Sequence, residues 1–113
     1  MPFIDSKISM TVSDEKKVSI KEKLGKAISV MGKTESYLMV GFDDDYDLFF
    51  AGKKVEKGAY VAVSVYGSVR PEQADAMTEE ICKILNEELD IPADKVYVTY
   101  RGVTDWGFNG RNF

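Results

Sequence analysis

The chain carries the same order of elements twice: an extended segment, an amphipathic helix and a second extended segment. The first unit covers about residues 1–52 and the second about residues 58–113, within one predicted domain of residues 1–113. A helix that crosses between two parallel strands of a sheet forms a right-handed βαβ unit. Two such repeats on one sheet predict an α+β fold with a mixed four-stranded sheet, two helices on one face and short edge strands.

The first unit opens with an alternating segment, Pro2 to Met10, that predicts a strand. Ser13 is the expected N-cap of a helix, and Gly32 is expected to end that helix. Three- and four-residue steps predict the buried helix face, formed by Val18, Leu24, Ala27, Ile28 and Met31. The apolar run Tyr37 to Phe42 then predicts a strand covered on both faces, and Leu48 to Gly52 predicts a short edge strand.

The second unit begins with the clearest strand of the chain, Ala59 to Gly67, which is rich in β-branched and aromatic residues. Pro71 opens a helix at its first turn, and this helix is expected to stop before Ile91-Pro92. Its predicted buried face is formed by Ala74, Met77, Ile81, Ile84 and Leu85. Lys95 to Arg101 predicts a strand, whereas residues 102–113 carry three glycines and a cluster of large aromatic residues.

The predicted strands keep apolar residues on both sides of the sheet. Phe42 and Met39 lie on opposite sides of one strand, and Val63 and Tyr66 on opposite sides of another. The helices cover only one side, and no further segment is left to form a third layer. We therefore expect an oligomer in which copies of the chain bury the other side.

The absence of histidine narrows the chemistry more than any other feature of the composition. It excludes Ser-His and Cys-His nucleophile pairs and removes the commonest zinc ligand. A catalytic base would have to be a carboxylate, a lysine, a tyrosine or the amino terminus. With a net charge of −4, the chain also lacks the basic surplus of nucleic-acid-binding proteins, so no such partner is expected.

Two other features favour structural roles. Cys82 is the only cysteine, which excludes an intrachain disulfide and a CxxC motif, and its apolar neighbours favour a buried, unreactive thiol. The acidic cluster from Asp43 to Asp47 suggests calcium, but it lacks the glycine and the glutamate of an EF-hand loop. A charged turn at a sheet edge is the favoured interpretation. We expect neither a metal nor a cofactor.

The chain begins Met1-Pro2-Phe3-Ile4 and holds no apolar run of about 18 residues, so we expect neither a signal peptide nor a membrane span. A cytoplasmic protein without a membrane partner is therefore expected. If Met1 is removed, Pro2 becomes a secondary amine, which can move protons near neutral pH. Many ordinary chains also begin with Met-Pro, so this dipeptide alone does not establish catalysis.

Several motifs follow one another along the chain. They are Met1-Pro2-Phe3-Ile4, Met31-Gly32-Lys33 with Tyr37, Val63 to Gly67, Pro92 to Tyr100, and Trp106 to Phe113. In their order and spacing the chain resembles the macrophage migration inhibitory factor family of the tautomerase superfamily, over essentially its whole length. The resemblance implies a homotrimer whose sheets form a barrel around a central channel, with active sites at the subunit interfaces.

The resemblance also implies an activity, the keto-enol tautomerisation of 2-keto acids such as phenylpyruvate. Pro2 matches the catalytic base of the family, and Lys33 matches a lysine that binds the substrate carboxylate. Tyr97 matches a pocket tyrosine supplied by the neighbouring subunit. Without the family context, Lys33 is an ordinary cation at a helix C-terminus and Tyr97 an ordinary strand aromatic.

Other positions match the family less closely. Tyr66 matches a residue whose backbone N–H faces the substrate carboxylate, and its bulky side chain is expected to change the substrate range. Thr99 stands where relatives often have asparagine. The aromatic rim of the family is matched by Tyr37, Trp106, Phe108 and Phe113. An aromatic cluster that seals the trimer interface is the alternative to a substrate-binding wall.

Two other functions compete with the enzyme. One is a secreted, cytokine-like ligand of a protein receptor, released without a signal peptide, whose pocket is vestigial. The other is a purely structural trimer, which predicts no pocket beside Pro2. Thiol-disulfide chemistry is not expected, because the CxxC of the best-known family member is replaced here by Tyr60-Val61-Ala62-Val63.

Overall fold

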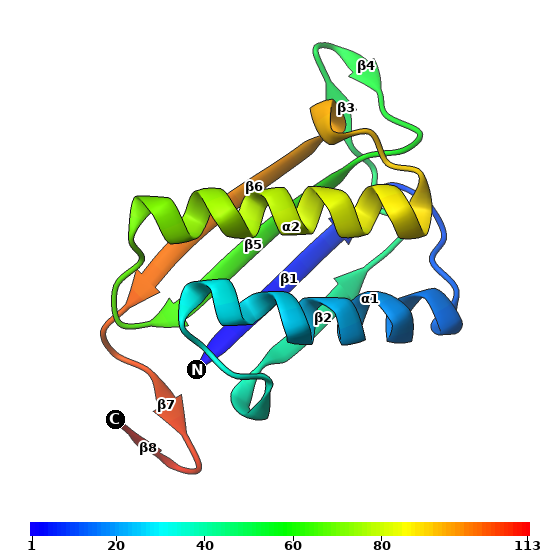
Figure 1. Ribbon diagram of the computed structural model, residues 1–113. Coiled ribbons are helices and arrows are strands. Elements are labelled where there is room, and N and C mark those ends of the chain that lie inside the picture. Colours follow the sequence, from blue (N-terminus) through cyan, green and yellow to red (C-terminus); the bar gives the residue numbers. More distant parts are fainter.

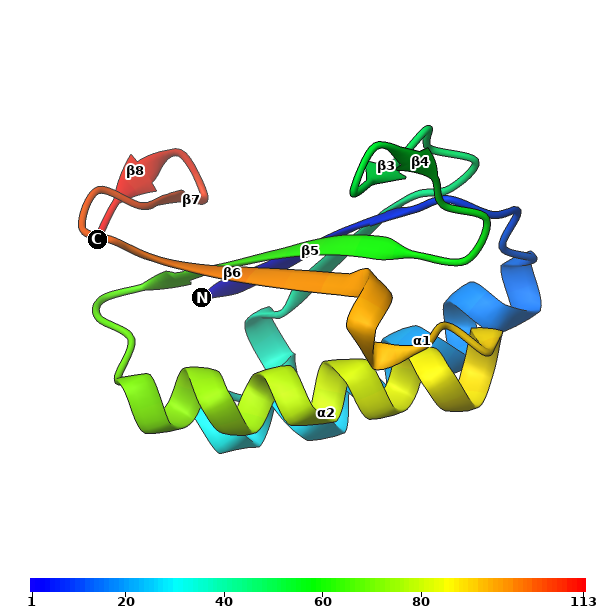
Figure 2. The same cartoon turned by 90° about the horizontal axis from the view of Figure 1, so that it is seen from above.

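The computed structural model describes all residues, 1–113. A four-stranded sheet in the order β2-β1-β5-β6 forms one layer, and two helices lie side by side against one of its faces (Figures 1 and 2). The main elements are β1 (Pro2–Ile8), α1 (Asp14–Ala27), β2 (Met39–Asp43), β5 (Ala59–Tyr66), α2 (Pro71–Leu89) and β6 (Val96–Val103). No helix is both long and apolar enough to span a membrane.

Smaller elements lie at the ends of this core. Two hairpins are formed by β3 (Phe49–Phe50) with β4 (Lys53–Lys54), and by β7 (Gly107–Phe108) with β8 (Arg111–Asn112). Short 3-10 helices cover Ile28–Met31 (η1), Glu35–Tyr37 (η2) and Ala93–Lys95 (η3). The hairpins project from opposite ends of the sheet, on the side away from the helices (Figure 2).

The sheet pairing confirms the predicted fold class. Strands β1 and β2 are parallel, as are β5 and β6, and each pair is joined through a helix. The two βαβ units meet where β1 runs antiparallel to β5, with Pro2 opposite Val65 and Ile8 opposite Ala59. The sheet is therefore mixed, with both helices on one face.

Strict alternation places one side of the sheet in the core. In β5, the buried residues Val61, Val63 and Val65 face the helices, while the intervening residues are only partly covered. Their neighbours Ile4 and Ile8 in β1 are also buried. The helices contribute Ile20, Leu24, Met77, Ile81 and Leu85 to the same core. We call this side of the sheet the closed face and the other side the open face.

One predicted core residue of the first helix is wrong. Val18 is 50% exposed, whereas Ile20, which the prediction omitted, is fully buried. Two residues turn an α-helix by about 200°, so these side chains point in nearly opposite directions. Ile20 and Leu24 lie four residues apart and share the face that meets the sheet.

The prediction for the middle of the chain needs three corrections. The strand expected from Tyr37 starts at Met39, because Glu35–Tyr37 forms the η2 turn. This strand is not covered on both faces, since Met39 is 68% exposed. The expected edge strand at Leu48 to Gly52 belongs to a separate hairpin, in which Phe49 pairs with Lys54.

The end of the first helix and the C-terminal hairpin follow from their turn residues. Gly32 has φ +71°, which confirms it as the left-handed residue after η1. The last hairpin turns through Asn109 and Gly110, with φ +55° and +85°. An Asn-Gly pair favours a two-residue turn of this handedness, so the sequence contained a signal that the prediction did not use.

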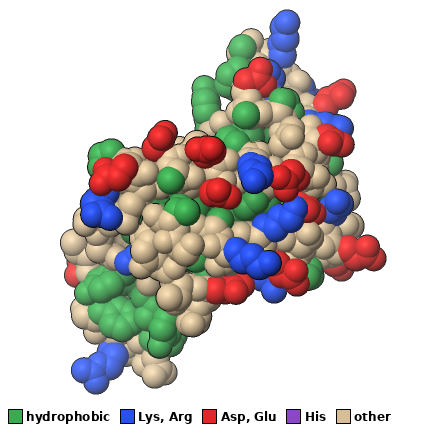
Figure 3. Space-filling model, in the orientation of Figure 1, with side chains coloured by type: hydrophobic (Ala, Val, Ile, Leu, Met, Phe, Trp, Pro, Cys, Tyr) green, Lys and Arg blue, Asp and Glu red, His purple; other side chains and the backbone are tan.

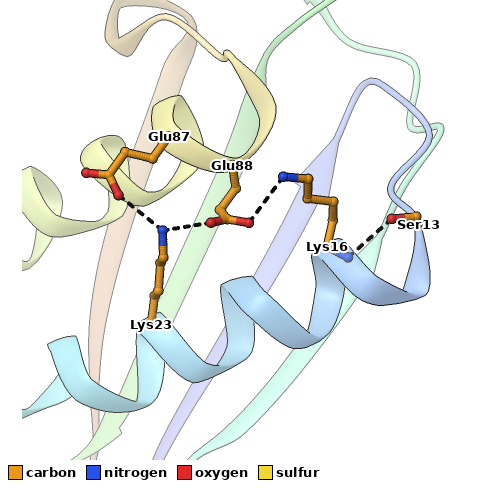
Figure 4. A network of polar contacts seen from close by, with 5 residues as sticks. All are labelled: Ser13, Lys16, Lys23, Glu87 and Glu88. Carbon is orange, nitrogen blue, oxygen red and sulfur yellow. Dashed lines mark hydrogen bonds and ion pairs between the residues drawn. The ribbon is translucent and has the colours of Figure 1, made fainter.

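On their outer side, the two helices are joined by ion pairs (Figure 4). Glu88 of α2 lies between Lys16 and Lys23 of α1, with N–O distances of 3.5 and 2.7 Å. Lys23 also contacts Glu87 at 3.1 Å. The hydrogen bond from Lys23 to Glu88 lowers the pKa of this carboxyl group. The Ser13 side chain accepts a hydrogen bond from the backbone N–H of Lys16, as expected of an N-cap.

Candidate functional site

A cavity of about 670 Å³ opens beside the amino terminus. Its floor is formed by Met1, Pro2 and Phe3 at the start of β1, together with Ser64 of β5. Its walls come from residues 36–39 and from Val103, Trp106, Gly107 and Phe108. Both chain ends lie at this end of the sheet (Figure 1). A pocket beside Pro2 is the feature that a purely structural trimer was expected to lack.

Pro2 is fixed by the sheet. It is fully buried and lies opposite Val65 in the antiparallel pair of β1 and β5. The last hydrogen bond of this pair runs from the backbone N–H of Tyr66 to the carbonyl oxygen of Met1, with an N–O distance of 2.9 Å. The proline nitrogen therefore lies next to the backbone N–H of Tyr66, which points towards the amino terminus.

Lys33 brings a positive charge to this corner. It follows Gly32, and its Nζ donates a hydrogen bond to the carbonyl oxygen of Tyr66 at 3.2 Å. Lys33 forms no ion pair with a carboxylate. Burial and, to a smaller extent, the charge of Lys33 lower the pKa of the Met1 amino group. A base at the chain end therefore loses its proton more readily than an ordinary amino terminus does.

The side chain of Tyr66 lies outside the cavity. Its ring packs against Phe113, with 5.3 Å between the ring centroids. Only the backbone of Tyr66 faces the amino terminus. The side chain that was expected to change the substrate range thus lies outside the cavity. Directly after Tyr66, the backbone of Gly67 lies close to that of Gly102. A Cβ on Gly102 would collide with the carbonyl oxygen of Gly67.

Aromatic side chains form one wall. Phe108 packs edge-on against Tyr37 at 5.8 Å and stacks on Phe113 at 6.2 Å. Trp106 lines the cavity, and its carbonyl oxygen accepts a hydrogen bond from the N–H of Phe113. Figure 3 shows hydrophobic side chains gathered on the surface over the corner that holds the β7–β8 hairpin. The structure thus gathers the four residues of the expected rim, three of them lining the cavity and Phe113 behind them.

Tyr97 lies elsewhere. It is opposite Tyr60 in the pairing of β5 with β6, five residues along β5 from Val65, the partner of Pro2. That spacing corresponds to roughly 17 Å along the strand. Tyr97 is 65% exposed and packs edge-on against Phe50 of β3 at 5.6 Å. Within one chain it does not reach the cavity beside Pro2.

Phe3, Ser36 and Ser64 are among the lining residues that were not expected at the site. Phe3 and Ser64 are directly opposite in the antiparallel pair, and both point to the open face. Strand alternation could have placed them, because each is next in sequence to a residue of the closed face. Ser36 lies in η2, where the sequence showed no periodicity to place it.

The acidic cluster and the cysteine lie away from this site. Asp44 accepts a hydrogen bond from the N–H of Val12 at 2.9 Å, which lowers its pKa, and it also contacts Lys17. Asp45 accepts a hydrogen bond from the Thr11 hydroxyl. These carboxylates hold a turn against the strand end, as the favoured interpretation predicted. Cys82 is half-buried, and burial raises the pKa of its thiol.

Comparison with curated proteins identifies distant relatives with one name. A macrophage migration inhibitory factor homolog of Brugia malayi is 24% identical over 115 residues, which cover 100% of this chain and 99% of the relative. Macrophage migration inhibitory factor of Xenopus laevis is 29% identical over 84 residues, covering 73% of this chain and 72% of the relative.

Solved structures and a family model agree with these relatives. The crystal structure of Leishmania major MIF2 superimposes with a TM-score of 0.94 at 32% identity, covering 100% of this chain and 97% of that one. A macrophage migration inhibitory factor homologue from Prochlorococcus marinus has a TM-score of 0.88 at 26% identity, with 98% of each chain covered. The family model for macrophage migration inhibitory factor matches residues 1–113. The chain therefore belongs to the macrophage migration inhibitory factor family.

Proposed function

We propose that the protein is an intramolecular isomerase that interconverts the keto and enol forms of phenylpyruvate-like 2-keto acids. The observation that carries this proposal is the position of Pro2 on the floor of an aromatic-walled cavity, with the cation of Lys33 held beside it by Tyr66. Removal of Met1 turns the Pro2 nitrogen into a secondary amine that serves as the general base.

The reaction needs one proton to move between carbon and oxygen. The neutral Pro2 amine takes a proton from the carbon next to the keto group, and the electron pair of that C–H bond forms the C=C bond of the enol. The π electrons of the C=O bond move to the oxygen, which then receives the proton from the amine. The ketonisation direction reverses these steps.

Electrostatics favour a neutral amine at working pH. Burial and the charge of Lys33 lower the pKa of the amino group on Met1. Pro2 is the next residue of the same strand, so we expect the same two effects on its amine once Met1 is removed. Lys33 binds the substrate carboxylate as a point charge, and the aromatic wall of Tyr37, Trp106 and Phe108 holds the phenyl group.

We also propose that the active protein is a homotrimer. The open face exposes Met39 and Tyr97, and both edge strands of the sheet, β2 and β6, have a free side. Copies of the chain would cover these surfaces and bring Tyr97 of one subunit to the cavity of another. There its hydroxyl would stabilise the developing enolate oxygen. We place this enzyme in the cytoplasm, where Met1 is removed.

The test compares chains that differ only at the reacting nitrogen. A chain with free Pro2 is expected to accelerate phenylpyruvate ketonisation, followed by ultraviolet absorbance. Pro2→Gly, with Met1 removed, should lower kcat/KM by about 10²- to 10⁴-fold, the usual contribution of a general base. Intact mass should establish the chain end, and light scattering should report an unchanged trimer. Equal turnover by both chains would rule out Pro2 as the base.

A protein ligand with a vestigial pocket is the second candidate. It is favoured by the name of the Brugia malayi and Xenopus laevis relatives and by the exposed aromatic surface of Tyr37, Phe108 and Phe113. Such a protein would show no rate acceleration that depends on a free Pro2 amine. The same assay therefore separates the two candidates.

A further inference from the structure

Tyr97 lies on the edge strand β6, which has a neighbouring strand on one side only. Its side chain is 65% exposed, so little of the surrounding chain restricts it. A side chain in such a place can adopt more than one staggered rotamer. The aromatic contact of its ring is with Phe50 of β3, at 5.6 Å between the centroids and 62° between the ring planes. This contact favours one orientation of Tyr97 over the others.

Phe50 is itself held in place by the β3–β4 hairpin. The hairpin is closed by a hydrogen bond from the backbone N–H of Val55 to the carbonyl oxygen of Leu48, with an N–O distance of 2.9 Å. Val55 is buried, and its side chain packs against Gly58 so closely that a Cβ there would collide with it. The ammonium group of Lys95 lies over the Phe50 ring, 5.3 Å from its centroid. The ring therefore offers Tyr97 a fixed surface.

The orientation of the ring matters because a hydrogen bond depends steeply on distance. An O–H···O bond needs about 2.5–3.0 Å between its oxygens. A misplacement of about 1 Å in an active site can cost roughly 10²-fold in rate. A change of rotamer moves a tyrosine hydroxyl further than that. A hydroxyl that stabilises a transition state from an exposed ring therefore needs a contact that selects its rotamer.

We propose that Phe50 is a positioning residue: it holds the Tyr97 ring in the rotamer from which the hydroxyl serves the site of the neighbouring subunit. This inference rests on the proposed function, in which Tyr97 acts across the subunit interface. Phe50 acts through Tyr97 and needs no contact with the substrate. The β3–β4 hairpin thereby becomes a part of the catalytic machinery of the next subunit.

The first test removes the ring of Phe50 and keeps its apolar character. In chains without Met1, Phe50→Leu should lower kcat for phenylpyruvate ketonisation by about three- to tenfold, the factor that one aromatic pair contributes, and leave KM unchanged. Phe49→Leu is the matched control from the same strand, because Phe49 is 69% exposed, and it should keep its kcat. Light scattering should report the same trimer for both. Equal kcat in the two variants would overturn the proposal.

A double variant separates positioning from a general loss of structure. Once Tyr97→Phe has removed the hydroxyl, nothing remains to be positioned, so adding Phe50→Leu should lower kcat no further. Phe50→Tyr keeps a ring at this position and should retain the wild-type kcat. Losses that multiply in the double variant would overturn the proposal. If Tyr97→Phe alone leaves kcat unchanged, the proposed role of Tyr97 fails and that of Phe50 falls with it.

A spectroscopic readout does not depend on turnover. In the wild-type chain, nuclear Overhauser effects should join the ring protons of Phe50 and Tyr97. The ring resonances of Tyr97 should shift in Phe50→Leu and stay in place in Phe49→Leu. Absence of these effects in the wild-type chain would overturn the proposal even in an active enzyme. If the effects are present and the protein has no tautomerase activity, the proposed function fails while the orientation of Tyr97 by Phe50 stands.

Discussion

The two faces of the sheet differ in how completely a single chain buries them. Ile4 and Val63 on the closed face, and Ile81 of α2 in the same core, are almost wholly buried. On the open face, Met39 and Tyr97 are 68% and 65% exposed. The closed face accounts for the stability of a single chain, whereas the open face holds the residue that the proposed site still lacks. Substitutions on the two faces should therefore affect different measurements.

The largest effect on stability is expected on the closed face. Ile81→Ala removes buried methyl groups and should lower the free energy of unfolding by about 2–5 kcal/mol, measured by urea unfolding. Val18→Ala, on the exposed side of α1, is the matched control and should change it by less than about 0.5 kcal/mol. Similar losses in both variants would contradict the assignment of the faces.

On the open face, Tyr97 should affect turnover without affecting the fold. Tyr97→Phe removes only the hydroxyl and should lower kcat by roughly tenfold or more, as loss of a transition-state hydrogen bond does, with unfolding unchanged.

Subunit mixing tests where Tyr97 acts. Trimers reassembled from Pro2→Gly and Tyr97→Phe chains should regain activity, because some sites then combine an intact Pro2 with an intact Tyr97 from different subunits. Every site would stay defective if both residues came from one chain. Mixed trimers no more active than their parents would therefore place Tyr97 outside the neighbouring site.

Lys33 lies where the amino end of β1 meets the loop after η1, and its effect should appear in the pH profile. The base works when neutral, so kcat/KM should rise as the pH increases through the pKa of the Pro2 amine. Because the positive charge of Lys33 lowers the pKa at the chain end, Lys33→Gln should move this rise to higher pH and reduce activity at neutral pH. A higher KM with an unchanged pH profile would mean that Lys33 acts only in carboxylate binding.

The smallest effect is expected outside both faces, between the helices. Glu88 is 10% exposed, and its pKa is lowered chiefly by the hydrogen bond from Lys23. Its ionised form therefore stabilises the fold fully above the ordinary value of 4.5, and this contribution is lost as the pH falls through the lower folded-state value.

Glu88→Gln should lower the free energy of unfolding by about 1 kcal/mol at pH 7. The difference from the wild-type chain should disappear in acid. Glu87→Gln is the control. It removes a contact with Lys23 that is more exposed, so it should lower the free energy of unfolding by less. A pH-independent loss in Glu88→Gln would point to packing instead of charge.

The sequence predicted well those elements in which a periodic pattern repeats several times. Eight alternating residues placed β5, and Met77, Ile81, Ile84 and Leu85 repeat often enough in α2 to identify its buried face. The first helix was harder, because its lysine-rich sequence left a sparse apolar pattern in which Val18 was chosen instead of Ile20. Strands of two residues, as in β3 and β4, are too short for any period to be read.

The candidate site was predictable only in part. Pro2, Lys33 and the aromatic rim were found through short motifs whose order matches the family. The contact between Met1 and Tyr66 was not predictable, because it depends on the register of two strands and joins residues that are 65 positions apart in the chain. The direction of the Tyr66 ring depends on Phe113, a contact between distant segments that no local pattern specifies.

The open face also links the stability of the proposed trimer to mass action. If three copies must meet to cover Met39 and Tyr97, the folded state gains from every increase in total protein, and the melting temperature should rise with concentration. Dilution would then dissociate the trimer, which would lower the stability of the fold and disrupt the sites shared between subunits. A cell could set the activity of such a protein through its abundance alone.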